Sequence, residues 1–230
     1  FKDKKVETSK GLLTLHFVDK KKLLVEFPVS LMGREFLLGS KVVETSDMGN
    51  GPAGTMSYTP RHIKFAVVDS TLYMKEVSRT GQNMIFSSSA NQNMQEGLKK
   101  NSLSTIVDAF TIAAFNKDSS AVVVDMTSYF VSHTENMNPF SSGKRTMEYG
   151  SGRQAVKFKD DLSYLMGVKA FEDNVSIISK LTYLMNLSVG GQLVSVDEPV
   201  SITVNRTLLL LPEKPQMRPR LADPRIGIGT

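Results

Sequence analysis

The 230-residue chain contains no cysteine, no tryptophan and only three histidines. Without cysteine it forms no disulfide, has no thiol nucleophile and holds no zinc through thiolates. No apolar run approaches the roughly 18 residues that a membrane-spanning helix needs. The longest apolar runs, such as Ala121–Val124 and Leu208–Leu211, have the length of strands. The N-terminal segment Phe1–Lys5 has no apolar stretch like that of a signal peptide.

Recognisable catalytic motifs are also absent. His16, His62 and His133 do not occur in a His-Glu-x-x-His pattern, which would place two imidazoles on one helix face around zinc. No Gly-x-Ser-x-Gly nucleophile motif occurs, and Ser141–Lys144 satisfies Ser-x-x-Lys only within a Gly-containing loop. The sequence therefore assigns no catalytic residue and no metal ligand, and we expect no cofactor in this segment. The alternative is a metal site formed by these three histidines, if the fold brings them together from distant strands.

The segment Gly49–Gly54 matches the G-x-G-x-x-G pattern of dinucleotide-binding loops. That mechanism requires a helix to start at the loop, so that its amides and dipole meet the pyrophosphate. Residues 55–60 and a strand follow instead, and Pro52 lacks the backbone donor that such a loop uses. The pattern indicates a glycine-rich connection between strands.

The net charge of +5 is concentrated near the two ends of the sequence. Residues 1–22 sum to +4, residues 212–230 to +2, and the remainder to −1. A nucleic-acid-binding domain carries a basic stripe on a folded face. The distribution therefore argues against nucleic acid as a partner.

Alternation of apolar and polar residues is the dominant pattern and predicts strands. We expect a mainly β fold, an antiparallel β-sandwich or partly closed barrel of about nine strands with one or two short helices. The expected strands are Leu13–Phe17, Leu23–Phe27, Phe36–Val43, Ile63–Val67, Leu72–Val77, Leu103–Phe115, Ala121–Asp125, Val175–Met185 and Val200–Leu211. Short helices are expected over Ser128–Val131, after Asp125 or Thr127 as cap, and over Leu162–Met166, capped by Asp160 or Asp161.

Three irregular stretches, 45–60, 80–97 and 132–155, are the expected places for ligand contacts, because binding residues concentrate on long loops. The aromatic candidates in or beside them are Tyr58, Tyr129, Phe140 and Tyr149, with a peptide or a glycan as the candidate ligand. Anchoring of the loops to the core is the alternative interpretation of these side chains.

The C-terminal segment holds four of the nine prolines, which cannot continue a ladder or a helix. We therefore expect one β-rich domain over residues 1–211 and an extended connector over residues 212–230 that leads to a further module. The connector residues singled out are Pro212, Glu213, Lys214, Pro215, Arg218, Arg220 and Arg225. The arginines are candidates for bidentate pairing with acids of a neighbouring module, or else are solvated linker charges.

Several stretches, taken in order, carry a resemblance to a known family. They are Lys10–His16, Leu31–Leu38, Ala114–Ser119, Val122–Thr127, Phe171–Val175 and Leu210–Pro215, followed by Arg218–Arg220 and Asp223–Gly227. Together they resemble the uncharacterised β-rich domain that precedes the catalytic module in zinc-dependent metallopeptidases of Bacteroidota.

The resemblance implies a secreted, periplasmic or outer-membrane-attached parent protein whose zinc and catalytic helix lie in the downstream protease module. This chain would then be a non-catalytic accessory domain that packs against that module or regulates it. A free-standing β-sandwich that binds glycan or protein is the alternative, and an independent hydrolase is a third hypothesis.

Overall fold

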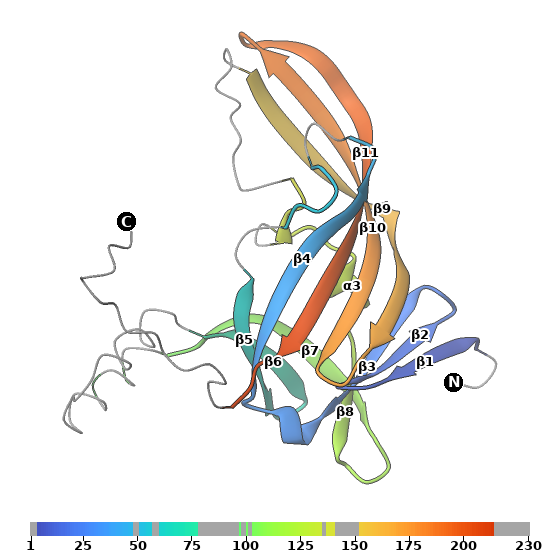
Figure 1. Ribbon diagram of the computed structural model, residues 1–230, viewed down its shortest axis with the longest axis vertical. Coiled ribbons are helices and arrows are strands. Elements are labelled where there is room, and N and C mark those ends of the chain that lie inside the picture. Colours follow the sequence, from blue (N-terminus) through green and yellow to red (C-terminus); the bar gives the residue numbers. More distant parts are fainter. Residues whose placement is uncertain are drawn as a thin grey trace, which may run out of the picture.

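The computed structural model describes residues 4–47, 51–56, 60–77, 97, 100, 103–134, 137–140 and 152–213, without the side chains of residues 152–154. The described strands form one antiparallel sheet of eleven strands in the order β1-β2-β3-β8-β7-β6-β5-β4-β11-β10-β9 (Figure 1). The strands are β1 (Val6–Lys10), β2 (Thr14–Val18), β3 (Lys22–Pro28), β4 (Glu35–Thr45), β5 (Arg61–Val68), β6 (Thr71–Glu76), β7 (Thr105–Phe115), β8 (Ala121–Asp125), β9 (Gly152–Ala170), β10 (Asn174–Val189) and β11 (Gln192–Leu210). A 3-10 turn, η1 (Val29–Leu31), and a one-turn helix, α3 (Thr127–Phe130), accompany them.

The period-two pattern places one face of each strand in a common core. In the β2–β3 hairpin, Leu15 pairs with Val25 and Phe17 with Leu23, and all four side chains are buried. Further into the core, the rings of Phe27, Phe36 and Phe65 lie 4.6 to 6.0 Å apart between centroids. Edge-on and tilted ring contacts at such distances add to the stabilisation from apolar burial.

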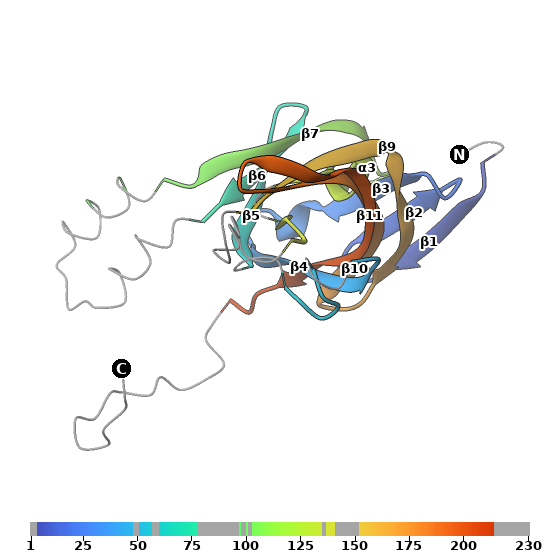
Figure 2. The same ribbon diagram turned by 90° about the horizontal axis from the view of Figure 1, so that it is seen from above.

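The sheet curls around α3, so that its two end strands approach each other (Figure 2). β9 lies against β1 and β2, and the Ala170 amide donates to Ser9 Oγ at 2.9 Å. The Leu12 amide donates to the carbonyl of Phe171 at 2.6 Å. No ladder joins β9 to β1 within the described residues, so the sheet is not closed into a barrel.

A second feature is the long β10–β11 hairpin, which rises with the first half of β9 above the body of the sheet (Figure 1). Its turn consists of Gly190 and Gly191, both with positive φ, as a two-residue hairpin turn of type I′ requires. The inner face of this arm carries its own apolar cluster, in which Val42 of β4 joins Leu181, Tyr183, Met185, Val200, Ile202 and Val204.

The predicted mainly β, antiparallel fold is confirmed, and the sheet has eleven strands where about nine were expected. The predicted helical turn near residues 128–131 is present as α3; its N-cap is Met126, and Asp125 Oδ1 accepts from the Thr127 amide at 2.9 Å.

The helix expected over Leu162–Met166 is wrong, because these residues belong to β9. β1 and β9 have no counterpart among the expected strands. Two irregularities interrupt the pairing of β9 with β10, and Leu162, Tyr164 and Met166 are about half exposed on its outer face. Because of the irregular pairing and the exposed apolar side chains, the sequence of β9 does not show the regular alternation that predicts a strand.

Candidate functional site

The point where β11 ends is held by contacts that we call the exit clamp. Arg34 Nη2 donates to the carbonyl of Leu211 at 3.2 Å, and Nη1 lies 3.1 Å from Glu213 Oε1. The Leu211 amide donates to the carbonyl of Glu35 at 2.9 Å. These contacts fix the direction in which the chain leaves the sheet, through Pro212. The other predicted connector residues lie outside the described residues: Lys214, Pro215, Arg218, Arg220 and Arg225.

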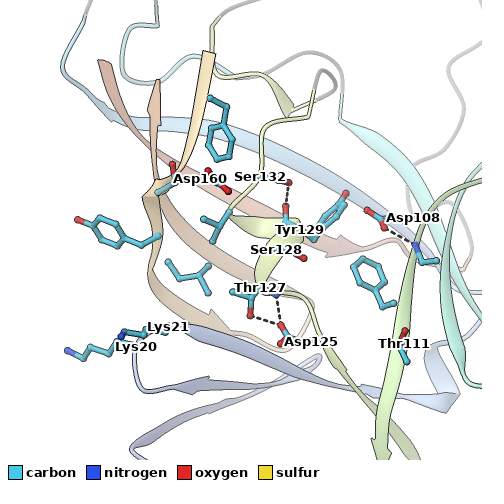
Figure 3. A pocket seen from close by; sticks show the side chains of 17 residues that line it. Lys20, Lys21, Asp108, Thr111, Asp125, Thr127, Ser128, Tyr129, Ser132 and Asp160 are labelled. Atoms are coloured by element: carbon cyan, nitrogen blue, oxygen red, sulfur yellow. Dashed lines mark hydrogen bonds between the residues drawn. The ribbon is translucent and has the colours of Figure 1, made fainter. Parts of the chain in front are cut away.

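A cavity of about 880 Å³ opens between α3, β7, β9 and the β2–β3 turn (Figure 3). Its floor is apolar and includes the buried side chains of Phe110, Tyr129 and Leu165. The ring of Tyr129 stands nearly perpendicular to that of Phe110, with centroids 5.6 Å apart. A cavity of this volume, with an apolar floor and a few polar groups around it, is the usual form of a ligand site.

Five charged side chains surround the cavity: Asp108, Asp125, Asp160, Lys20 and Lys21. Each aspartate is oriented by a backbone amide that donates to its Oδ1. The donors are Ala109 at 2.8 Å, Thr127 at 2.9 Å and Asp161 at 3.0 Å, respectively. Lys20 and Lys21 lie across the cavity from Asp108 (Figure 3).

Two of these aspartates are placed by irregularities in strand pairing. The register of β7 against β6 shifts between Ile106 and Asp108. In β9, Lys159 pairs with Thr182 and Tyr164 with Lys180, so residues 160–163 form a bulge opposite one residue of β10. Bulges redirect side chains and recur beside functional sites.

The bulge of β9 is stabilised by its own hydrogen bonds. Ser163 Oγ donates to the carbonyl of Lys159 at 2.6 Å and accepts from the Thr182 amide at 3.0 Å. Thr182 Oγ1 in turn donates to the carbonyl of Leu162 at 2.9 Å. Asp160 therefore sits on a defined backbone.

Behind the cavity, a polar layer formed by Ser40, Ser179 and Arg206 separates the two apolar cores. The three residues come from adjacent strands, and Arg206 is the register partner of Ser40. Arg206 is fully buried and donates to the carbonyls of Tyr129 at 3.1 Å and Ser132 at 2.8 Å. Ser179 Oγ donates to the carbonyl of Phe130 at 2.7 Å. The layer thus satisfies the carbonyls at the C-terminal end of α3, which have no partner within the helix.

Burial dominates the ionisation of this region. It raises the pKa of Tyr129 to about 12, although Arg61 and Arg206 act in the opposite direction. It also raises the pKa of Tyr183 and lowers that of the Arg206 guanidinium. Arg206 Nε and Ser40 Oγ have no hydrogen-bond partner within the described part of the chain.

The predicted loop aromatics have different positions. Phe140 packs edge-on against Tyr183 at 4.7 Å between centroids and contributes to the core of the arm, so it anchors its loop. Tyr129 forms part of the cavity floor. Tyr58 and Tyr149 lie outside the described residues.

The three histidines lie apart, each with a partner of its own. His16 Nε2 is 3.0 Å from Glu26 Oε1, His62 Nε2 is 2.7 Å from Glu35 Oε2, and His133 Nδ1 is 3.2 Å from the Tyr183 hydroxyl. Within the described ranges, no group of three His, Asp or Glu side chains is placed to hold a metal ion.

The described part of the glycine-rich segment, from Gly51, includes a turn in which Gly54 has a φ of 92°. Met56 then forms an isolated bridge with Lys41, and β5 begins at Arg61. No helix begins within residues 51–56. In the part of the chain that the structure describes, no helix is long and apolar enough to cross a bilayer.

Residues 54–230 match the family described as "Domain of unknown function (DUF5117)". This match covers well over half of the chain. The chain belongs to the DUF5117 family. Residues 1–45 match a second family, "Domain of unknown function (DUF5118)". Neither the curated proteins nor the solved structures gave a match.

Both candidate sites combine residues from the DUF5118 and DUF5117 segments. Arg34 belongs to residues 1–45, whereas Leu211 and Glu213 belong to the DUF5117 match. Lys20 and Lys21 belong to the first segment, and the three aspartates of the cavity to the second.

Sequence reasoning missed the charged residues of the cavity and the buried Arg206. For Arg206 a signal was available: it alternates with Val204 and Leu208, so the strand pattern places it on the core face. For Asp108 and Asp160 the sequence carries no comparable signal, because their positions depend on bulges.

Proposed function

We propose that this chain is a non-catalytic accessory domain of a secreted zinc metallopeptidase, which packs against or regulates a protease module that follows it. The exit clamp carries the proposal, together with the resemblance of Leu210–Pro215, Arg218–Arg220 and Asp223–Gly227 to the corresponding segment of the metallopeptidases. The proposal extends to a periplasmic or outer-membrane-attached location for the parent protein.

The exit clamp supports a positioning role because it acts on the first residues of the predicted connector. Arg34 contacts both Leu211 and Glu213, so the connector starts in one direction rather than swinging freely. Proline restricts φ and makes a linker stiff. A connector with a fixed start and four prolines suits a domain that holds its neighbour in a defined orientation.

The described side chains do not fit a zinc site. The three histidines are engaged at separate places, and no third ligand converges on any of them. The proposal therefore assigns zinc to the protease module and derives no catalytic step within the described residues.

The test uses the complete protein encoded by the native gene. We expect a His-Glu-x-x-His helix beyond Thr230, about one zinc per chain by mass spectrometry, and peptide hydrolysis that a chelator abolishes. Arg34→Ala should lower kcat/KM by up to about fivefold, because an exposed ion pair and one hydrogen bond contribute about 1 kcal/mol. Lys41→Ala, an exposed change on β4, the strand that begins directly after Arg34, is the matched control.

Two outcomes would overturn the proposal. A reading frame that ends at Thr230 would leave a free-standing β-domain, for which glycan or protein binding becomes the leading function. Equal activity of the wild type, Arg34→Ala and Lys41→Ala in a zinc-containing protease would show that the exit clamp positions nothing of consequence.

A further inference from the structure

We infer that the cavity between α3, β7 and β9 binds peptides that carry an apolar side chain flanked by lysine or arginine. This inference goes beyond the accessory role and does not depend on it, because the cavity is formed by the described chain alone. It rests on the floor of the cavity, the charges around it and the shape of its β9 wall.

The floor suits an apolar anchor. Phe110, Tyr129 and Leu165 are each at most 6% exposed, so their surfaces toward the cavity are preformed. α3 is held from behind by Arg206 and Ser179 and does not have to become ordered when a ligand binds. Preorganisation of this kind lowers the entropic cost of binding.

The charges select the flanking residues. Asp108 and Asp160 have no ion pair with another described residue, and Asp125 has only a contact of 4.0 Å with Lys22. Their Oδ1 atoms are oriented by backbone amides, which leaves Oδ2 as the acceptor for an incoming cation. Ammonium and guanidinium groups form the strongest hydrogen bonds with such carboxylates.

The two lysines place positive charge at one end of the cavity, opposite in sign to the charge of the aspartates. Lys20 and Lys21 lie at one corner, where a peptide carboxylate or an acidic side chain would be attracted (Figure 3). A site with both signs of charge around an apolar floor complements a charged peptide better than a neutral glycan. Charge complementarity of this kind determines specificity and the rate of association.

The bulge of residues 160–163 determines whether the peptide can bind as an added strand or only through its side chains. β9 is an end strand of the sheet, and an unpaired edge invites the addition of another strand. The bulge interrupts that edge beside the cavity, so a continuous added strand cannot form there. The peptide therefore binds through its side chains in the cavity.

The test measures the fluorescence anisotropy of labelled peptides with the 230-residue chain. The probe is acetyl-Lys-Phe-Lys-Phe-Lys-amide, and the control is the same peptide with glutamate in place of lysine. We expect saturable binding of the lysine peptide, weaker binding in high salt and at least about tenfold weaker binding of the glutamate peptide.

Neighbouring aspartates provide a matched pair of variants. Asp160→Asn keeps the acceptor for the Asp161 amide and should weaken binding of the lysine peptide about tenfold, the value of one charge-assisted hydrogen bond. Asp161→Asn changes the adjacent carboxylate, which does not line the cavity, and should leave the affinity unchanged. Asp108→Asn provides the same test on the opposite wall if Asp160→Asn does not fold.

Three results would overturn the inference. They are equal binding of the two peptides, equal loss of affinity in Asp160→Asn and Asp161→Asn, and displacement of the probe by maltohexaose. The last result would assign the cavity to a glycan. None of them bears on the exit clamp, so the accessory role is tested separately.

Discussion

Replacing Arg206 with methionine tests the polar layer most directly. The guanidinium is fully buried, faces no carboxylate among the described residues and donates to the carbonyls of Tyr129 and Ser132. Methionine is apolar and flexible and fills much of the same space, but it cannot donate to these carbonyls. Arg206→Met therefore removes the donor to the Ser132 carbonyl and one of the two side-chain donors to the Tyr129 carbonyl, which still accepts from Ser132 Oγ at 3.0 Å.

The magnitude is a balance of two terms. Each hydrogen bond from a charged donor contributes about 1.5–3 kcal/mol, so the two bonds together are worth roughly 3–6 kcal/mol. The wild type also loses free energy on folding, because the charged guanidinium is removed from water, as its lowered pKa indicates. Methionine avoids this desolvation cost, which offsets part of the lost hydrogen-bond energy. We expect a net loss of about 2–4 kcal/mol in the free energy of unfolding.

The assay is urea unfolding followed by far-ultraviolet circular dichroism, because the chain has no tryptophan for fluorescence. Hydrogen exchange at the amides of α3 reports the local effect. Thr207→Met changes the next residue of β11, on the opposite face, and should alter stability by no more than about 0.5 kcal/mol. An Arg206→Met variant as stable as the wild type would refute the reasoning, since desolvation of the charge would then cost as much as the hydrogen bonds contribute.

Three further predictions concern ionisation, strand closure and assembly. An unfolded tyrosine ionises near pH 10, whereas Tyr129 has its pKa raised to about 12, so stability that is complete below pH 10 falls between pH 10 and 12. Tyr129→Phe should reduce this fall by about 1.4 kcal/mol per pH unit, measured by urea unfolding at several pH values; an unchanged slope would contradict it. In Gly11→Ala the new Cβ would clash with the backbone of Phe171, so the variant should lose about 1–3 kcal/mol of stability in a thermal melt, and wild-type stability would refute the close approach. Residues 1–45 and 54–230, produced separately, should each fail to unfold cooperatively and should regain a cooperative transition when mixed, whereas independent melting of either piece would show that it folds alone.

The elements that sequence reasoning could identify are those in which local pattern and final environment agree. β2, β3 and β4 each bury one alternating face, and their strands were predicted within a few residues. β9 could not be identified, because Asp160-Asp161 resembles a helix cap and the bulge breaks the period. The local sequence gave the wrong answer there because pairing with β10 outweighs local propensity.

The cavity was beyond prediction for a different reason. Its walls come from four segments, near residues 20–21, 108–111, 125–132 and 158–165, and their meeting depends on the order of strands in the sheet. β3 pairs with β8, and β4 lies between β5 and β11, so neighbours in the sheet are distant in sequence. Alternation predicts which face of a strand is buried, but it carries no information about which strand lies next to it.

The boundary between the two matched families runs through the middle of one sheet. The segment of residues 1–45 supplies β1–β3, which extend the sheet beyond β8, and β4, which is inserted between β5 and β11. Removing it would uncover edges on β5, β8 and β11 and expose the core around Phe65, Val122 and Leu208. Because the exit clamp and the cavity also draw residues from both segments, the DUF5118 and DUF5117 segments are parts of one structural unit. A function assigned to one of them must therefore be tested with both present.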